Sequence, residues 1–120
     1  MDMLYYIYIG SNRVTIDHLS KIAGGMFMAV SSCNKAAKVI DGIRERYNTS
    51  ILYEESTPQK DSQNITFLHK RFPRVYIILI TEGLQKEHRK LYLQAGVNNT
   101  LSPMASEESL LQMVKFLRLR

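Results

Sequence analysis

The segment Val75-Tyr76-Ile77-Ile78-Leu79-Ile80 is an unbroken apolar run in which most residues are β-branched. It shows neither the alternation of a strand with one solvated face nor the periodicity of an amphipathic helix. A strand of this kind is typical of the centre of a parallel sheet, where helices cover both faces. The segment therefore predicts an α/β fold in which 75–80 is a central strand.

Shorter apolar runs and amphipathic segments alternate on both sides of this strand. Because strands that alternate with helices are joined by right-handed crossovers, the pattern predicts a parallel sheet. Five strand–helix units in 120 residues indicate one doubly wound domain with the strand order 2-1-3-4-5. The predicted strands are 4–9, 26–30, 50–53, 75–80 and 97–101, the helical faces lie within 16–23, 36–47, 65–72, 84–95 and 106–117, and 56–61 reads as a loop.

The composition is that of an ordinary globular protein, with 45% hydrophobic and 22% charged residues. The single cysteine, Cys33, excludes an internal disulfide, and a disulfide-free domain of this size is typical of the cytoplasm. No basic segment precedes the first apolar run and no run is long enough to span a bilayer, so we expect no signal peptide and no membrane insertion. The net charge of +5 is spread over mostly single Lys and Arg residues, so we expect no direct contact with nucleic acid.

Several short motifs, taken in order, resemble the receiver domains of two-component response regulators. Thr81 ends the fourth predicted strand, Ala95-Gly96-Val97 leads into the fifth, and Ser102-Pro103 precedes the last helix. Glu54, with Pro58 four residues later, matches the phosphoacceptor and the proline of the loop that follows it. The resemblance covers essentially the whole chain and implies a chemotaxis-type, flavodoxin-like fold.

The resemblance also implies a phosphorylation pocket, and most of its chemical groups are changed here. Phosphoryl transfer in the family needs a metal-binding acidic pair, an acceptor Asp, a hydroxyl and a Lys, because negative charge must be spread onto a metal and cations. The matching positions are Ile9 and Gly10 for the acidic pair, Glu54 for the acceptor, Thr81 for the hydroxyl and Ser102 for the Lys. The chain is therefore expected to be an atypical, degenerate pseudo-receiver with no metal and no cofactor, and not an enzyme.

No other catalytic motif stands out in the sequence. The three histidines, His18, His69 and His88, fall in different predicted helices without the spacing of a metal site. Gly24-Gly25 follows a helix instead of a strand, so it indicates a helix end and not a phosphate-binding loop. The sequence thus favours a binding module.

In receivers, the surface formed by helix four, strand five and helix five is commonly where dimers or partners meet. The resemblance implies contact there with a protein partner, with an attached output domain or with a second copy. The last helix runs to Arg120, so we expect 1–120 to be the N-terminal domain of a longer protein whose output domain binds DNA or is an enzyme such as a sugar transferase. The residues expected on this surface are Glu87, Lys90, Tyr92, Gln94, Gln112, Lys115 and Phe116.

Three alternatives stay open at this point. An atypical response regulator would use Glu54 itself as phosphoacceptor, since a Glu carboxylate can be a nucleophile. A small flavodoxin-like enzyme or nucleotide binder would share the fold, and a nucleic-acid binder would use the net charge of +5. Labelling of Glu54 by phosphodonors, thermal shifts with nucleotides or flavins, and salt-dependent DNA binding distinguish these alternatives.

Overall fold

The computed structural model describes residues 3–44 and 46–118, although the side chains of residues 47 and 116–118 lie outside the description. Five strands and five α-helices alternate along this part of the chain. Their bounds are β1 Tyr5–Ile9, α1 Arg13–Ile22, β2 Met26–Val30, α2 Cys33–Asp41, β3 Thr49–Glu54, α3 Pro58–Arg71, β4 Tyr76–Ile80, α4 Lys86–Ala95, β5 Asn99–Leu101 and α5 Glu107–Arg118, with a 3-10 turn, η1 Arg46–Asn48, before β3.

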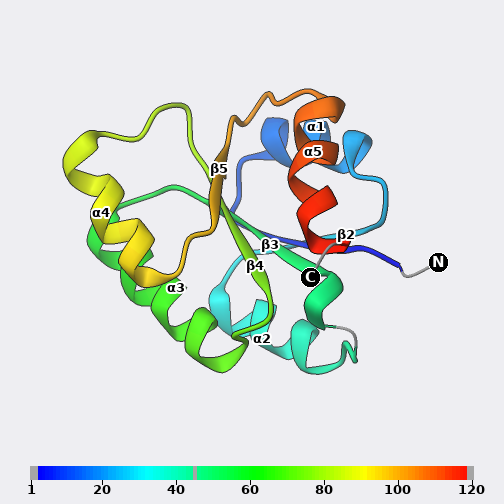
Figure 1. Cartoon of the computed structure of the whole chain (residues 1–120), viewed down its shortest axis with the longest axis horizontal. Helices are drawn as coiled ribbons and strands as arrows, with labels where there is room; N and C mark the ends of the chain where they lie inside the picture. The colour runs from blue at the N-terminus through cyan, green and yellow to red at the C-terminus, as the bar shows by residue number, and fades with distance from the viewer. Residues whose placement is uncertain (1–2, 45, 119–120) are drawn as a thin grey trace.

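The strands form one parallel sheet in the order β2-β1-β3-β4-β5, which confirms the doubly wound order predicted from the sequence. Helices α1 and α5 cover one face of the sheet, and α2, α3 and α4 cover the other (Figure 1). In the register of the sheet, Ile9 lies opposite Tyr53 and Glu54 lies opposite Ile80. Glu54 therefore reaches one residue past the end of β1, beside the loop that follows β1.

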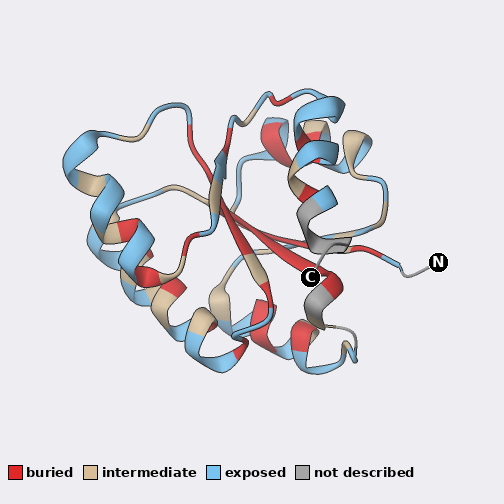
Figure 2. Cartoon of the chain, viewed as in Figure 1, coloured by how far each residue is buried: buried red, intermediate tan, exposed pale blue. Residues whose placement is uncertain are grey.

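Each face of the sheet has its own apolar core. Strand β4 contributes Ile77 and Leu79 to the core under α2, α3 and α4, and Ile78 and Ile80 to the core under α1 and α5. All four side chains are buried, and the central strands are buried along most of their length in Figure 2. Burial on both faces explains why 75–80 shows no alternation of apolar and polar residues.

The prediction of a loop at 56–61 is wrong, because α3 already begins at Pro58. Proline suits the first helical position, where its fixed φ is helical and its missing N–H would have no partner. Thr57 precedes it in an extended conformation, and Asp61 lies in the first turn, where an acid suits the helix dipole. The 14-residue helix turns Asp61 toward the sheet, and this side chain is completely buried.

Within 3–44 and 46–118, no helix is long and apolar enough to cross a bilayer. The backbone of α5 is followed as far as Arg118. Leu119 and Arg120, which end the chain and prompted the expectation of a following domain, lie outside the described residues.

Candidate functional site

The carboxyl ends of β1, β3 and β4 meet at one edge of the sheet, which is where ligands bind in doubly wound folds. Glu54 and Thr81 line the same open hollow of about 610 Å³. Gly10 lies with Glu54 along a neighbouring hollow, and the Ile9 side chain is buried in the core beneath it. Ser102 lies on the other side of Thr81, along a third hollow. The five predicted pocket residues thus share one edge but not one hollow: Glu54 and Thr81 line the first, Ile9, Gly10 and Glu54 the second, and Thr81 and Ser102 the third.

Glu54 turns its carboxylate back over the loop that follows β1. Its Oε1 accepts hydrogen bonds from the Tyr8 hydroxyl at 2.6 Å and from the Asn12 backbone N–H at 2.9 Å. The Ser11 N–H donates to Oε2 at 3.3 Å. A carboxylate with several such donors is satisfied without a cation. Glu54 therefore joins β3 to the β1–α1 loop and is not free to reach an incoming group.

Gly10 makes room for this arrangement. Its φ is +156°, in a region that favours glycine, and a Cβ at this position would lie 2.6 Å from Cβ, Cδ and Oε1 of Glu54. An acidic side chain at position 10, such as a metal-binding pair requires, is therefore incompatible with the observed position of Glu54. The glycine and the inward-turned carboxylate depend on each other.

The partner of Thr81 is Glu55, which was not among the predicted site residues. The Thr81 hydroxyl donates to Oε1 of Glu55 at 2.7 Å and accepts from the Gly83 N–H at 3.2 Å. Because Thr81 is buried, these bonds hold the start of the β4–α4 loop against the end of β3. The one sequence signal that pointed to Glu55 was the position of this residue directly after Glu54.

The hollow that Glu54 and Thr81 line is acidic. Its described lining includes Glu54, Glu55 and Glu82 and contains no Lys or Arg. Ser102 is exposed, and its Oγ accepts the Met104 N–H at 3.2 Å, within its own turn. Searched over the described ranges, the chain has no group of three or more His, Cys, Asp or Glu side chains arranged to hold a metal ion. A phosphoryl group placed here would therefore meet carboxylates without a neighbouring protein cation.

A second carboxyl group, which sequence reasoning missed, lies under the same edge. Asp61 accepts the Tyr53 hydroxyl on Oδ1 at 3.1 Å, and on Oδ2 it accepts the Tyr92 hydroxyl and the Ser56 N–H, both at 2.8 Å. Asn64 in turn donates to the Tyr53 hydroxyl at 3.0 Å. Burying a carboxyl group is unfavourable unless hydrogen bonds compensate it, and here three donors do so. Asp61 thus connects β3, the β3–α3 loop and α4.

The prediction that Tyr92 lies on the α4–β5–α5 surface is wrong. Its side chain is 0% exposed, and its hydroxyl points to Asp61 in the interior. A buried tyrosine needs a partner for its hydroxyl, and the unexpected burial of Asp61 supplies one. The Phe116 side chain lies outside the described residues, and the other members of the predicted surface, Glu87, Lys90, Gln94, Gln112 and Lys115, are exposed.

Burial raises the pKa of the tyrosine hydroxyls and of the cysteine thiol that lie near Glu54 and Asp61. The pKa of Tyr8 is raised by desolvation and further by its hydrogen bond to a carboxylate. The pKa values of Tyr53 and Tyr92 are also raised, first by desolvation and then by Asp61. Desolvation and the charge of Asp61 raise the pKa of Cys33 in the same way, so this thiol is a poor nucleophile at neutral pH.

The architecture and the position of the site define the fold of CheY-like response-regulator receiver domains. The sequence matches no protein-family model and no curated protein. Among solved structures, a response regulator from Thermotoga maritima is similar with a TM-score of 0.84 and 13% identity, over 99% of this chain and 100% of that one. A CheY-like protein (tadZ) from Pseudomonas aeruginosa gives a TM-score of 0.80 and 13% identity, over 100% of this chain and 96% of that one.

A third similar structure is a putative pilus assembly protein (cpaE) from Burkholderia thailandensis, with a TM-score of 0.73 and 14% identity. That match covers 98% of this chain and all of the other. At such low identity the likeness is one of fold, and function has to be argued from the residues of the site.

Proposed function

We propose that this chain is a regulatory protein-interaction domain with a receiver fold, in which internal hydrogen bonds have replaced phosphoryl-transfer chemistry. The observation that carries the proposal is the position of Glu54, whose carboxylate binds Tyr8 and Asn12 directly over Gly10. Phosphoryl transfer depends on accurate placement of the nucleophile, so a carboxylate that must first break these bonds is a poor acceptor.

The neighbouring residues support the same proposal. In a phosphorylated receiver, the hydroxyl after the fourth strand binds the phosphoryl group. Here the Thr81 hydroxyl is already bonded to the Glu55 carboxylate at 2.7 Å, and Ser102 brings no positive charge. We infer that the β4–α4 loop is held in one position without phosphorylation, so the domain acts by binding.

We assign partner contact to the exposed surface of α4, β5 and α5. A hollow of about 500 Å³ lies between α4 and β5, and its lining includes Arg89, Leu93 and Thr100. Leu93 is exposed at this position, so a partner that fills the hollow would cover an apolar side chain. The partner in this proposal is a second copy or an attached output domain. In the second case, 1–120 precedes the output domain in a cytoplasmic protein, and the output domain binds DNA or is an enzyme such as a sugar transferase.

The chemical half of the proposal is tested with a small phosphodonor. The chain is incubated with acetyl phosphate and Mg²⁺, and its intact mass is measured beside that of an active receiver as positive control. We expect no phosphoryl adduct on the wild type and no difference from Glu54→Gln. An adduct on Glu54 that is lost in Glu54→Gln would overturn the proposal in favour of an atypical phosphoacceptor.

The interaction half is tested by the mass of the protein in solution. If a second copy binds at α4–β5–α5, Gln94→Arg should convert dimer to monomer in sedimentation velocity, whereas Gln63→Arg, an exposed position on α3, should not. If the wild type and both variants are all monomers, a second copy is excluded as the partner. The attached output domain is then the partner that is left.

A further inference from the structure

Charge is distributed unevenly between the two helical layers. Among the described side chains, helices α1 and α5 are balanced, with Arg13, Lys21 and Lys115 against Asp17, Glu107 and Glu108. The other layer is strongly basic, since α2, α3 and α4 carry Lys35, Lys38, Lys60, Lys70, Arg71, Lys86, Arg89 and Lys90 against Asp41, Glu87 and the buried Asp61. The net charge of the chain is therefore concentrated on one side of the sheet.

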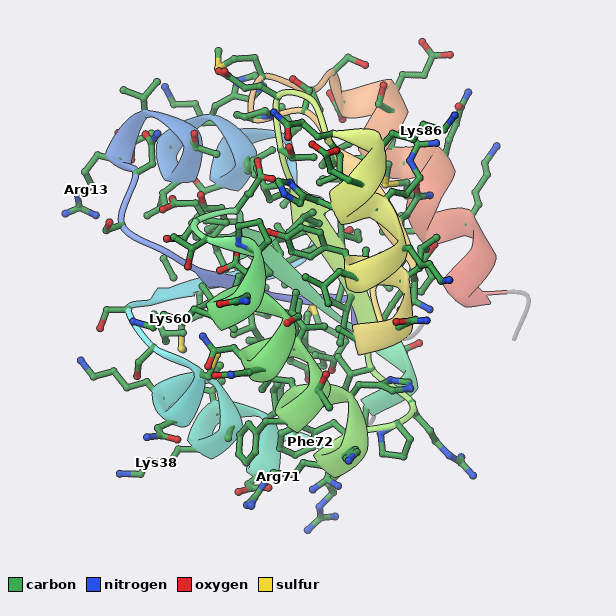
Figure 3. The ribbon with its side chains drawn as sticks, turned by 90° about the vertical axis from the view of Figure 1, so that its left-hand side faces the viewer. Arg13, Lys38, Lys60, Arg71, Phe72 and Lys86 are labelled. Carbon is green, nitrogen blue, oxygen red and sulfur yellow. The ribbon has the colours of Figure 1, made fainter. Side chains whose placement is uncertain are left out.

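Six lysines are exposed on this side, and Lys90 among them belongs to the α4–β5–α5 surface. We call the other five the basic face: Lys35 and Lys38 on α2, Lys60 and Lys70 on α3, and Lys86 on α4. They lie away from the helix positions that pack on the sheet. Figure 3 looks onto this layer, and the labelled Lys38, Lys60 and Lys86 extend outward from three different helices.

The lysines of the basic face have no acidic partner among the described residues. The two ion pairs found there both use Asp41, which lies 2.6 Å from Arg71 and 3.9 Å from Arg46. The Lys35 ammonium donates to the Ser31 hydroxyl at 3.1 Å. The one exposed acid of α2 is thus engaged by arginines, and the lysine charges face solvent.

Two large apolar side chains are exposed within this charged surface. Phe67 on α3 is 42% exposed and Leu93 on α4 is 58% exposed. Phe67 follows Lys60 by seven residues and precedes Lys70 by three, so the three side chains share one side of the helix. Aromatic and aliphatic residues surrounded by lysines are typical of surfaces that lie on anionic membranes, where apolar groups enter the headgroup region and lysines meet phosphates.

We propose that the α2–α3–α4 layer docks on an anionic lipid bilayer, with the basic face against the headgroups and Phe67 and Leu93 in the interfacial region. A bilayer can meet three helices at once. A nucleic-acid duplex would meet the lysines through its phosphates but would leave Phe67 without a base to stack on. This attachment is peripheral, and it leaves α5 and the carboxyl edge of the sheet open. Because it uses Leu93, which also lines the hollow assigned above to a protein partner, bilayer and partner would compete for α4.

Vesicle sedimentation tests the electrostatic part of the proposal. The chain should bind vesicles that contain phosphatidylglycerol, bind phosphatidylcholine vesicles little, and dissociate as salt is raised. The double variant Lys60→Glu/Lys70→Glu should bind at least about 20-fold more weakly, since each cation near an anionic surface changes affinity about fivefold. The matched variant Lys21→Glu/Lys115→Glu changes net charge equally on α1 and α5 and should stay within about twofold of wild type.

Fluorescence tests the apolar part, because the chain contains no tryptophan and Phe67→Trp introduces a single reporter. We expect the emission of this indole to shift to the blue on anionic vesicles and to be quenched by brominated lipid. Phe67→Ser should weaken binding without a change of charge. If the Phe67→Trp variant sediments with vesicles while its indole emission stays unchanged, this layer does not contact the bilayer and the proposal fails.

Two further outcomes would overturn the proposal. The first is an equal loss of vesicle binding in the α3 variant and the α1/α5 variant, which would show that net charge alone is responsible. The second is binding to duplex DNA that Lys60→Glu/Lys70→Glu abolishes, together with no binding to anionic vesicles. Circular dichroism checks the fold of each variant, and Lys60→Gln/Lys70→Gln, with a smaller but still selective loss expected, replaces the glutamate variant if that variant unfolds.

Discussion

Two carboxyl groups lie close to the carboxyl end of β3, and the fold holds them in different ways. Asp61 is completely buried and receives two tyrosine hydroxyls and one backbone N–H from three separate elements. Glu54 is half-buried and receives one hydroxyl and two N–H groups from β1 and the loop after it. The comparison shows that an acid's role follows from its own burial: Asp61 secures the core, whereas Glu54 closes a surface site.

The largest effect is expected from Asp61→Ala. This change leaves the Tyr53 and Tyr92 hydroxyls and the Ser56 N–H without their acceptor, so we expect a loss of about 3 kcal/mol in the free energy of unfolding. Asp61→Asn keeps one carbonyl acceptor and should lose about half as much. Urea denaturation measures both changes, with the exposed Asp17→Ala as a control that stays within about 0.5 kcal/mol of wild type. Equal stability of the two alanine variants would contradict the assignment of Asp61 to the core.

A smaller effect is expected from Gly10→Ala, which tests the packing of Glu54. The new Cβ would overlap the Glu54 side chain at a strained φ, so we expect a loss of about 2 kcal/mol. In a Glu54→Ala background the same change should be milder by about 1 kcal/mol, because the overlaps with Cδ and Oε1 are gone and only the overlap with Cβ remains. Gly24→Ala, where no atom lies within 4 Å of the added Cβ, is the matched control. A cost at Gly10 that is independent of Glu54 would rule out the proposed mutual dependence.

Tyr8→Phe removes one donor from Glu54 and should lower stability by about 1 kcal/mol. The same variant changes the alkaline limb of the stability curve. Because the pKa of Tyr8 is raised in the folded state, the folded state keeps a proton that the unfolded state loses above about pH 10. The contribution of the protonated Tyr8 to the free energy of unfolding is therefore fully present at neutral pH and is lost as pH rises above about 10. The fall in unfolding free energy above pH 10 should therefore be shallower in Tyr8→Phe by up to about 1.4 kcal/mol per pH unit. Parallel curves for variant and wild type would contradict this prediction.

The smallest effect is expected from Thr81→Val, which removes the bonds to Glu55 and Gly83. We expect a loss of about 1 kcal/mol or less and faster hydrogen exchange of the Gly83 amide, because the loop opens more often. Ser102→Ala, an exposed hydroxyl near the same edge, serves as control and should leave the Gly83 amide unchanged. Unchanged exchange in Thr81→Val would mean that Thr81 does not hold this loop.

The fold could be predicted because its signals are local. Unbroken apolar runs and helical periodicity predicted the alternation of strands and helices, and five such units in a short chain indicated the doubly wound strand order. The error at 56–61 arose where a local signal was overlooked, since Pro58 at a helix start is itself a recognised pattern. Because 56–61 was predicted to be a loop, the burial of Asp61 on a helix was not predicted. Without this buried acceptor, the sequence offered no reason to expect the Tyr92 hydroxyl in the interior.

The state of the candidate site could not be predicted in the same way. The sequence identifies Gly10, Glu54 and Thr81 as site residues. However, the direction of the Glu54 side chain is set by hydrogen-bond partners more than 40 positions away in the sequence. The pairing of Glu55 with Thr81 likewise spans 26 positions. Such contacts follow from the register of β1, β3 and β4, and this register becomes known only with the assembled sheet.

The proposed function requires that the Glu54 carboxylate is occupied by internal partners and does not accept a phosphoryl group. Beryllofluoride with Mg²⁺ imitates that group on active receivers, so the most direct measurement is an amide ¹H–¹⁵N NMR titration of the chain with both. We expect the resonances of 10–12, 54–55 and 81–83 to move no further with the mixture than with either component alone. Saturable shifts of these resonances that need both components and vanish in Glu54→Gln would contradict it.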